Sequence, residues 1–149
     1  MMTMSKLKFA DPYHENRIED YFFFRWKLLR QPWGQPKGTE RDDQEENSIQ
    51  RMIVDEDGNI IACGRFHLNS PHEAQIRYMA VDTGQRGKGI GKMMMEELES
   101  LAISAGVKTI VLQARENALE FYIACGYTKV KETFLLYNDI QHYLMIKKI

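Results

Sequence analysis

Two segments carry apolar residues at the spacing of a helix that buries one face. The first runs from Glu15 to about Arg30, and Pro32 ends it. The second follows a glycine-rich turn, and Gly106 suits its C-cap. Its apolar stripe consists of Ile90, Met94, Leu98, Leu101 and Ala105. Two shorter helices are predicted, an exposed polar one at 40–47 and another from Glu116 to about Ala124.

Short apolar runs bounded by turn residues predict strands between these helices. One hairpin turns at Asp57-Gly58, because an Asp-Gly pair suits a turn with positive φ. The strands are expected at 7–9, 51–54, 59–68, 75–81, 108–114, 127–136 and 140–146. Together these elements predict a mixed α/β domain, in which ligands usually bind at strand-to-helix junctions.

Length and composition narrow the class of protein. The 149 residues suit one globular domain over 1–149, with 44% hydrophobic and 28% charged residues. A net charge of −1 gives no reason to expect nucleic acid or membrane as a partner. Cys63 and Cys125 lie far apart in sequence, so neither a metal site nor a disulfide is expected. Because Met1 to Lys8 has no signal-peptide pattern and no apolar run nears about 20 residues, a cytoplasmic protein is expected.

The most informative stretch joins the strand at 75–81 to the second long helix. Its residues are Arg86, Gly87, Lys88, Gly89, Ile90, Gly91 and Lys92. The glycines allow the backbone to approach a ligand without a clash from Cβ atoms. The helix start offers unbonded N–H groups and the positive end of the helix dipole, and the three basic side chains add charge. These features predict a binding site for phosphate.

Known phosphate-binding loops differ in their spacing. A Walker A loop needs glycine where Arg86 stands and serine or threonine where Met93 stands. The dinucleotide fingerprint G-x-G-x-x-G also fails, because the glycines here alternate as G-x-G-x-G. A glycine-rich turn without a ligand is the remaining alternative. The pattern that fits from Arg86 to Gly91 is R/Q-x-x-G-x-G/A, and with it the strand-turn-helix unit resembles the GNAT acyltransferase superfamily.

This resemblance implies a fold and a cosubstrate. The fold would be a mixed, mostly antiparallel sheet of about six to seven strands, flanked by about four helices. Acetyl-CoA or a related acyl-CoA would place its pyrophosphate on the turn at 86–92 and leave coenzyme A as the product. Its pantetheine arm would pair with the strand at Met79, Ala80 and Val81.

A second block supports the resemblance. The stretch from Ala114 to Tyr127 is similar to the family pattern N-x-x-A-x-x-F-Y-x-x-x-G-F/Y, but Arg115 replaces its asparagine. Arg115 would then be the polar contact to the cofactor. Tyr122 resembles the family's acid, which gives a proton to the departing thiolate. An unperturbed tyrosine, with a pKa of about 10, stays protonated at neutral pH and can donate. The alternative role for Tyr122 is a core aromatic.

The implied reaction is direct attack of an amine on the thioester, with a backbone N–H near 79–81 stabilising the oxyanion. The base is ambiguous. Gln75 stands near the place where some members have a glutamate, and it cannot act as a base. Glu73 lies two residues earlier on the same strand face and is the preferred candidate, with a solvated carboxylate as the alternative. His67, His72 or a water relay could also serve.

The acceptor pocket is expected from the first helix and the loop after it. The candidates are Arg25, Trp26, Arg30 and Trp33, with Glu40 and Arg41 beside them. Alternatively, the tryptophans pack at the core edge and the charges are solvated. The segment 25–42 also looks like the acyltransferase half of larger bacterial proteins that carry a thioesterase-like second half.

The predicted function is transfer of an acetyl or short acyl group to an amine of a small molecule or an amino terminus. Two alternatives stay open, an acyl-CoA sensor without turnover and acyl transfer to a non-amine acceptor. A homodimer would form if an exposed last strand paired with a second copy.

Overall fold

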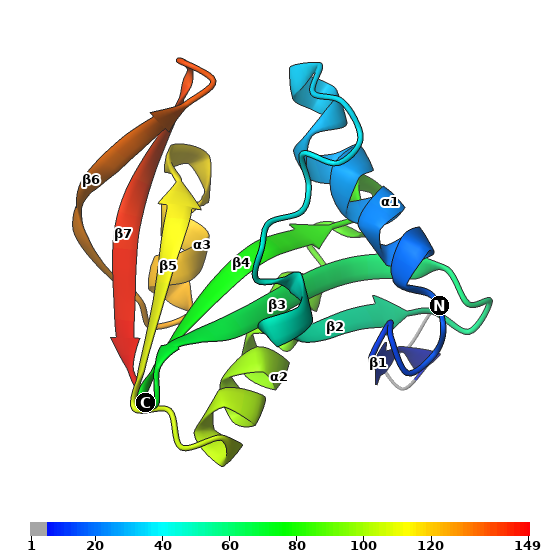
Figure 1. Ribbon diagram of the computed structural model, residues 1–149, viewed down its shortest axis with the longest axis horizontal. Helices are drawn as coiled ribbons and strands as arrows, with labels where there is room; N and C mark the ends of the chain where they lie inside the picture. Colours follow the sequence, from blue (N-terminus) through cyan, green and yellow to red (C-terminus); the bar gives the residue numbers. More distant parts are fainter. Residues whose placement is uncertain (1–5) are drawn as a thin grey trace. The chain divides into compact units, whose positions relative to one another are not determined.

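The computed structural model describes residues 6–149 and contains a seven-stranded sheet in the order β1-β2-β3-β4-β5-β7-β6 (Figure 1). The strands are β1 (Lys8–Ala10), β2 (Ile49–Val54), β3 (Ile60–Ser70), β4 (Glu73–Val81), β5 (Thr109–Arg115), β6 (Thr128–Leu136) and β7 (Ile140–Lys148). The α-helices of this part are α1 (Ile18–Leu29), α2 (Ile90–Ser104) and α3 (Leu119–Ala124). β4 and β5 run parallel, while β1–β2, β5–β7 and β6–β7 run antiparallel. The predicted mixed, mostly antiparallel sheet is therefore confirmed.

By packing, the chain divides into two compact units. One contains the described part of Met1–Arg65 together with Tyr78–Leu98, and the other contains Phe66–Arg77 with Glu99–Ile149. β3 and β4 each contribute residues to both units, and so does α2. The expectation of a single domain over 1–149 stays a prediction.

In the first unit, helices cover both faces of β3. A core cluster under α1 includes Tyr21, Phe22 and Cys63. On the opposite face, a Cβ at Gly64 would lie 3.0 Å from the Leu98 side chain of α2, so glycine is what allows this close packing. Adjacent strand residues point to opposite faces, and both faces are buried here. β3 is consequently buried from Ile61 to His67 instead of alternating between apolar and polar residues.

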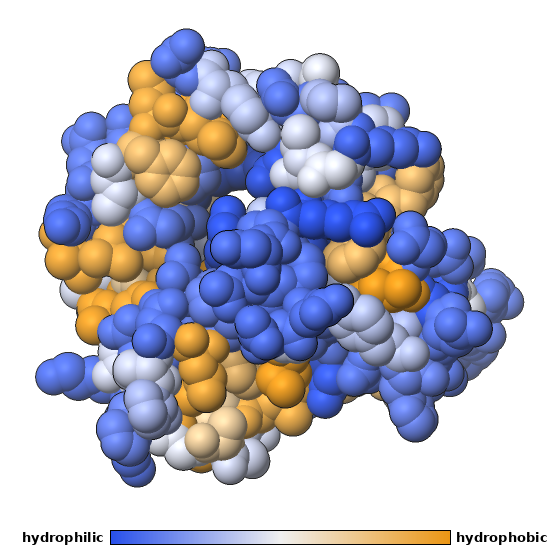
Figure 2. All heavy atoms as spheres, in the orientation of Figure 1, coloured by the Kyte–Doolittle hydropathy of each residue, from blue (hydrophilic) through white to orange (hydrophobic). Residues whose placement is uncertain are grey.

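In the second unit, β7 lies between β5 and β6. The β6–β7 hairpin turns through Tyr137 and Asn138, which both have positive φ. Apolar side chains gather near the end of this hairpin, at the upper left of Figure 2. In β6, Phe134 and Leu135 are 41% and 50% exposed. The prediction that the last strand is an exposed edge was wrong, because β7 has a partner on each side. The edge belongs to β6, whose pairing is interrupted by two register shifts.

Two further predictions about the elements need correction. The segment 40–47 is not an exposed helix: only Glu45–Asn47 forms a 3₁₀ turn, and Glu40 and Glu45 are buried. Their ion pairs and hydrogen bonds hold this segment in an irregular path. The apolar stripe of α2 is buried at Ile90, Met94 and Leu98, but Ala105 is exposed and Ala102 is buried instead. In residues 6–149, no helix is long and apolar enough to cross a membrane.

Candidate functional site

The glycine turn between β4 and α2 has the backbone that its sequence predicts. Gly87 and Gly89 adopt φ of 81° and 79°, a region that favours glycine. A Cβ at either position would meet no atom within 4 Å, so open space lies over both residues. The glycines are therefore required by backbone conformation and not by internal packing, which leaves the turn accessible to a ligand.

The start of α2 presents unbonded N–H groups beside this turn. The first hydrogen bond of the helix runs from the Met93 N–H to the Gly89 carbonyl, at 3.1 Å. The N–H groups of Ile90, Gly91 and Lys92 thus have no acceptor within the helix. The 15 residues of α2 also align their peptide dipoles, with the positive end at this turn. A phosphate fits both features, because it offers several acceptor oxygens and negative charge.

The basic side chains around the turn add to this positive potential. Arg86, Lys88 and Lys92 are exposed. Lys88 Nζ lies 3.2 Å from Gln85 Oε1, and none of the three forms an ion pair with a described residue. Because the whole chain has a net charge of only −1, this is a local concentration of positive charge.

The strand that leads into the turn has an irregular backbone at Tyr78. Its φ of 55° lies in the left-handed region, which costs a non-glycine residue about 1–3 kcal/mol. The Cys63 thiol donates to the Tyr78 carbonyl at 3.3 Å. Burial raises the pKa of Cys63 to about 11, which disfavours the thiolate that a nucleophilic cysteine needs. Met79, Ala80 and Val81, the predicted pantetheine strand, follow directly.

Three guanidinium groups surround the Tyr78 ring. The Cζ atoms of Arg25, Arg65 and Arg30 lie 4.4, 5.0 and 5.4 Å from its centroid. Cations within about 6 Å of an aromatic face are attracted to it, more strongly where water is excluded. This cage, formed by Arg25, Arg30 and Arg65, is well placed to hold Tyr78 in its unfavourable conformation.

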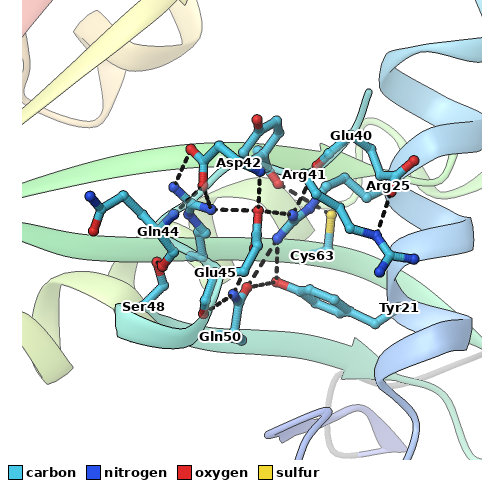
Figure 3. A network of polar contacts seen from close by, with 12 residues as sticks. Tyr21, Arg25, Glu40, Arg41, Asp42, Gln44, Glu45, Ser48, Gln50 and Cys63 are labelled. Atoms are coloured by element: carbon cyan, nitrogen blue, oxygen red, sulfur yellow. Dashed lines mark hydrogen bonds and ion pairs between the residues drawn. The ribbon is translucent and has the colours of Figure 1, made fainter. Parts of the chain in front are cut away.

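Glu45 holds two members of the cage, as Figure 3 shows for Arg25. Its Oε2 lies 2.9 Å from Arg25 Nη1 and 2.6 Å from Arg65 Nη1. Asp42 adds two bonds to Arg65, at 2.6 and 2.7 Å. Gln50 accepts from Arg25 and from the Tyr21 hydroxyl and donates to Glu45. The result is an ordered polar network inside the first unit.

Sequence reasoning missed this network. Glu45, Gln50 and Arg65 do not form a recognisable sequence motif. The acidic segment around Glu45 was expected to be exposed to solvent. One signal was present: Arg65 interrupts a run from Ile60 to Phe66 that has no other polar side chain. A polar residue at such a position needs a buried partner.

The predicted acceptor residues occupy different environments. Arg25 is fully buried, so it supports the site from within. Trp26 donates its indole N–H to the Gln35 carbonyl at 2.9 Å, and Arg30 Nε donates to the Thr39 carbonyl at 3.0 Å. Both side chains thereby fasten the loop after α1. Trp33 lies in that loop and is 38% exposed.

The neighbouring candidates Glu40 and Arg41 pair with each other at 2.8 Å. A cavity of about 560 Å³ in the same unit lies between α1 and β3 and borders Asp82 and Gln85. None of the predicted acceptor residues lines it. Their assignment to a pocket stays a prediction.

Tyr122 lies in α3, in the second unit. It packs edge-to-face on Phe121 and Tyr127, at centroid distances of 5.0 and 6.1 Å. Burial, with a smaller contribution from Cys125, raises the pKa of Tyr122 to about 12. Its hydroxyl makes no hydrogen bond with any residue in 6–149. Tyr122 is thus a protonated donor without an internal acceptor. Arg115 ends β5 and precedes the 3₁₀ turn Glu116–Ala118.

The candidate base Glu73 begins β4, so the strand does reach this residue. Asn69 Nδ2 donates to Glu73 at 2.9 Å and to Gln75 at 3.2 Å, which shows that the two side chains share a face. His72 Nδ1 lies 3.3 Å from the Gly106 carbonyl, and His67 is buried. The base stays undecided among these groups.

Comparisons with known proteins agree with this geometry. A family model described as the acetyltransferase (GNAT) family matches residues 12–127. The curated "Uncharacterized N-acetyltransferase YjcF" of Bacillus subtilis (strain 168) is 25% identical over 134 residues, which cover 90% of this chain and 94% of that protein.

Two solved structures share the fold. An aminoglycoside 6'-N-acetyltransferase complexed with coenzyme A has a TM-score of 0.74 at 19% identity and covers 95% of this chain and 96% of its own. The ribosomal-protein-S18-alanine N-acetyltransferase from Escherichia coli has a TM-score of 0.77 at 18% identity, covering 96% and 94%. The narrower likeness to two-domain proteins stays a prediction. Since the family model covers most of the chain, including the glycine turn and the Tyr122 block, the protein belongs to the GNAT family of acetyltransferases.

Proposed function

We propose that this acetyltransferase transfers an acetyl or other short acyl group from acyl-CoA to the amine of a small molecule or an amino terminus. The observation that carries the proposal is the start of α2. There, open glycines at 87 and 89 adjoin three unbonded N–H groups, and basic side chains flank them. A pyrophosphate offers the acceptor oxygens and negative charge that such a helix start favours.

The strand before the turn is the proposed holder of the thioester. Met79 and Val81 are half-buried, while Ala80 is buried. The irregularity at Tyr78 turns the backbone just before Met79, so an N–H in this segment is a reasonable donor to a tetrahedral oxyanion. A donor fixed in advance costs no rearrangement during the reaction, and loss of one such donor typically costs about 100- to 1,000-fold in kcat.

The chemical step needs two proton transfers. The amine nitrogen forms a bond to the carbonyl carbon, and its surplus proton passes to a base. The bond between carbon and sulfur then breaks, and the thiolate takes a proton. We assign that donation to Tyr122, because its raised pKa keeps it protonated and its hydroxyl is uncommitted. Glu73 stays the proposed base, acting through a chain of water molecules, because it begins β4 six residues before Met79 and a strand rises about 3.3 Å per residue.

Arg115 is the proposed polar contact to the cosubstrate in the second block. Its place in the family pattern supports this assignment, since it occupies the position that usually carries asparagine. A guanidinium can donate to phosphate or carbonyl oxygens. The replacement thus keeps a donor at this position and adds a positive charge.

A homodimer also stays a proposal, with a changed basis. The edge strand β6 has three exposed large apolar side chains, those of Val130, Phe134 and Leu135. Contact through these side chains fits better than strand pairing, because the register shifts interrupt the β6 ladder. Sedimentation at several protein concentrations would test this association.

A thermal melt with and without coenzyme A tests the cosubstrate directly. Coenzyme A at a hundred times its dissociation constant should stabilise the fold by about 2.7 kcal/mol. No change in Tm at millimolar coenzyme A would contradict the proposal. A thiol-release assay with acetyl-CoA over a panel of amines then tests turnover. Binding without release for any amine would favour the sensor alternative, and release only with alcohols or thiols would favour a non-amine acceptor.

A further inference from the structure

Arg30 differs from the other two members of the cage around Tyr78. The guanidinium groups of Arg25 and Arg65 both reach the carboxylate of Glu45. Arg30 makes no ion pair with any residue in 6–149. The neighbouring carboxylate of Glu40 accepts from Arg41 and from the Gly38 N–H, so it is already engaged. Among the described residues, Arg30 is therefore the member of the cage that has no carboxylate within ion-pair distance.

This charge is largely removed from water. Arg30 is only 8% exposed. Nε donates to the Thr39 carbonyl and Nη1 to the Leu29 carbonyl, each at 3.0 Å. Nη2 makes no hydrogen bond with a described residue. Burying a cation without a counter-ion is costly, and such groups are normally paired.

A structural role explains part of this arrangement. Arg30 is the C-cap residue of α1, where a cation interacts favourably with the helix dipole. An exposed lysine or arginine would give the same benefit without burial. The helix end also accounts for one nitrogen atom only, because Nη1 donates to Leu29 whereas Nε donates to Thr39 in the loop after α1. Neither the free Nη2 nor the position beside Tyr78 is explained by capping.

The position of Arg30 connects it to the chemistry. Its Cζ lies 5.4 Å from the Tyr78 ring centroid, and Tyr78 directly precedes the proposed thioester strand at Met79. A group bound to Arg30 would thus lie near the side chain of Tyr78, the residue that leads into that strand. We propose that Arg30 binds an anionic group, carboxylate or phosphate, on the acceptor whose amine is acylated. This inference rests on the proposed function and adds the substrate class: an amine that also carries an oxyanion.

The chemistry of the two groups supports this match. A guanidinium forms charge-assisted hydrogen bonds with carboxylate and phosphate oxygens, which are stronger than neutral ones. The free Nη2 supplies at least one such bond, and the anion supplies the missing counter-charge. The Nε and Nη1 bonds to backbone carbonyls keep the guanidinium in place before the acceptor arrives.

The test compares acceptors in pairs that differ by the anion. We would measure thiol release at saturating acetyl-CoA for the common L-amino acids against their C-terminal amides. Phosphoethanolamine against ethanolamine forms the second arm. In the wild type, the anionic member of at least one pair should have a kcat/KM about tenfold or more above its neutral partner. The arm that shows this preference identifies carboxylate or phosphate as the group.

The variant Arg30→Gln should abolish that preference. A rise in KM for the anionic acceptor is expected, while the neutral acceptor and the KM for acetyl-CoA are little changed. Lys37→Gln is the matched control, because Lys37 is an exposed cation of the same loop. The Lys37→Gln variant should prefer the anionic acceptor over its neutral partner as strongly as the wild type does. If Arg30→Gln does not fold, Arg30→Lys replaces it and should lower the preference while keeping the charge.

Two results would overturn the inference in distinguishable ways. Turnover with amines but equal rates within every pair, or an unchanged preference in the Arg30 variant, would remove Arg30 from acceptor binding and leave the proposed function intact. No thiol release with any amine, combined with no stabilisation by coenzyme A, would remove the proposed function and this inference together.

Discussion

Glu45 lies 2.9 Å from the guanidinium of Arg25, and both side chains are buried. The same carboxylate oxygen lies 2.6 Å from Arg65. Buried ion pairs are not strong stabilisers when compared with apolar residues, because the charges lose their hydration. If only one partner of such a pair is replaced, however, the other partner is left as an unpaired buried charge. Glu45 therefore links the stability of the first unit to the cage around Tyr78.

Replacing Glu45 with glutamine should destabilise the fold substantially. Glu45→Gln keeps the shape of the side chain but leaves Arg25 and Arg65 without their shared carboxylate. Removal of one member of a buried pair typically costs about 3–5 kcal/mol. Urea unfolding followed by fluorescence measures the change. The exposed neighbour supplies the control: Glu46→Gln should alter the free energy of unfolding by less than about 0.5 kcal/mol. Equal effects at both positions would contradict the role of Glu45.

The same contacts predict a dependence of stability on pH. Burial alone would raise the pKa of Glu45, but Arg25 and Arg65 outweigh it and hold this pKa below the ordinary 4.5. A carboxyl group with a depressed pKa in the fold contributes stability above its unfolded pKa and loses it as pH falls through the folded value. Wild-type Tm should thus fall as pH drops below about 4.5. In Glu45→Gln this part of the acid sensitivity should be missing.

The glycine turn offers a test that separates strain from ligand binding. Gly89 and Gly58 have similar φ, 79° and 83°, and a Cβ at either would meet nothing within 4 Å. Alanine at each should cost a similar amount, about 1–2 kcal/mol, because the left-handed conformation is unfavourable with a Cβ. Only Gly89→Ala should also weaken acyl-CoA binding, with KM raised about tenfold or more, since its methyl group occupies the proposed pyrophosphate site. A similar KM in both variants would argue against that site.

The parts of the site that the sequence predicted are those set by local backbone chemistry. The turn at Gly87 and Gly89 needs positive φ, and the helix after it must leave N–H groups unbonded. Both requirements are visible within a few residues of sequence. The α/β class and most element positions follow in the same way from apolar periodicity and turn residues.

The missed parts depend on contacts between residues distant in sequence. Arg25 meets Glu45 and Arg65 only after a helix, an irregular loop and a strand have packed together. Tyr78 occurs in a run that reads as a regular strand, so its positive φ cannot be read from local propensity. The order of β7 and β6 is likewise a property of the whole sheet, since either strand could have formed its edge.

Tyr122→Phe tests the proposed acid with a small structural change. The Tyr122 hydroxyl makes no hydrogen bond within 6–149, so its removal should leave the free energy of unfolding nearly unchanged. Loss of a general acid typically lowers kcat by about 100- to 10,000-fold, and the KM for acetyl-CoA should be little altered.

Tyr127→Phe is a control with the reverse expectation, because the Tyr127 hydroxyl donates a hydrogen bond to Glu99 at 2.8 Å. It should lower stability while kcat stays near the wild-type value. With a pKa of about 12, Tyr122 should cause no loss of wild-type kcat between about pH 7 and 10. A normal kcat in Tyr122→Phe would assign thiolate protonation to another donor, such as solvent.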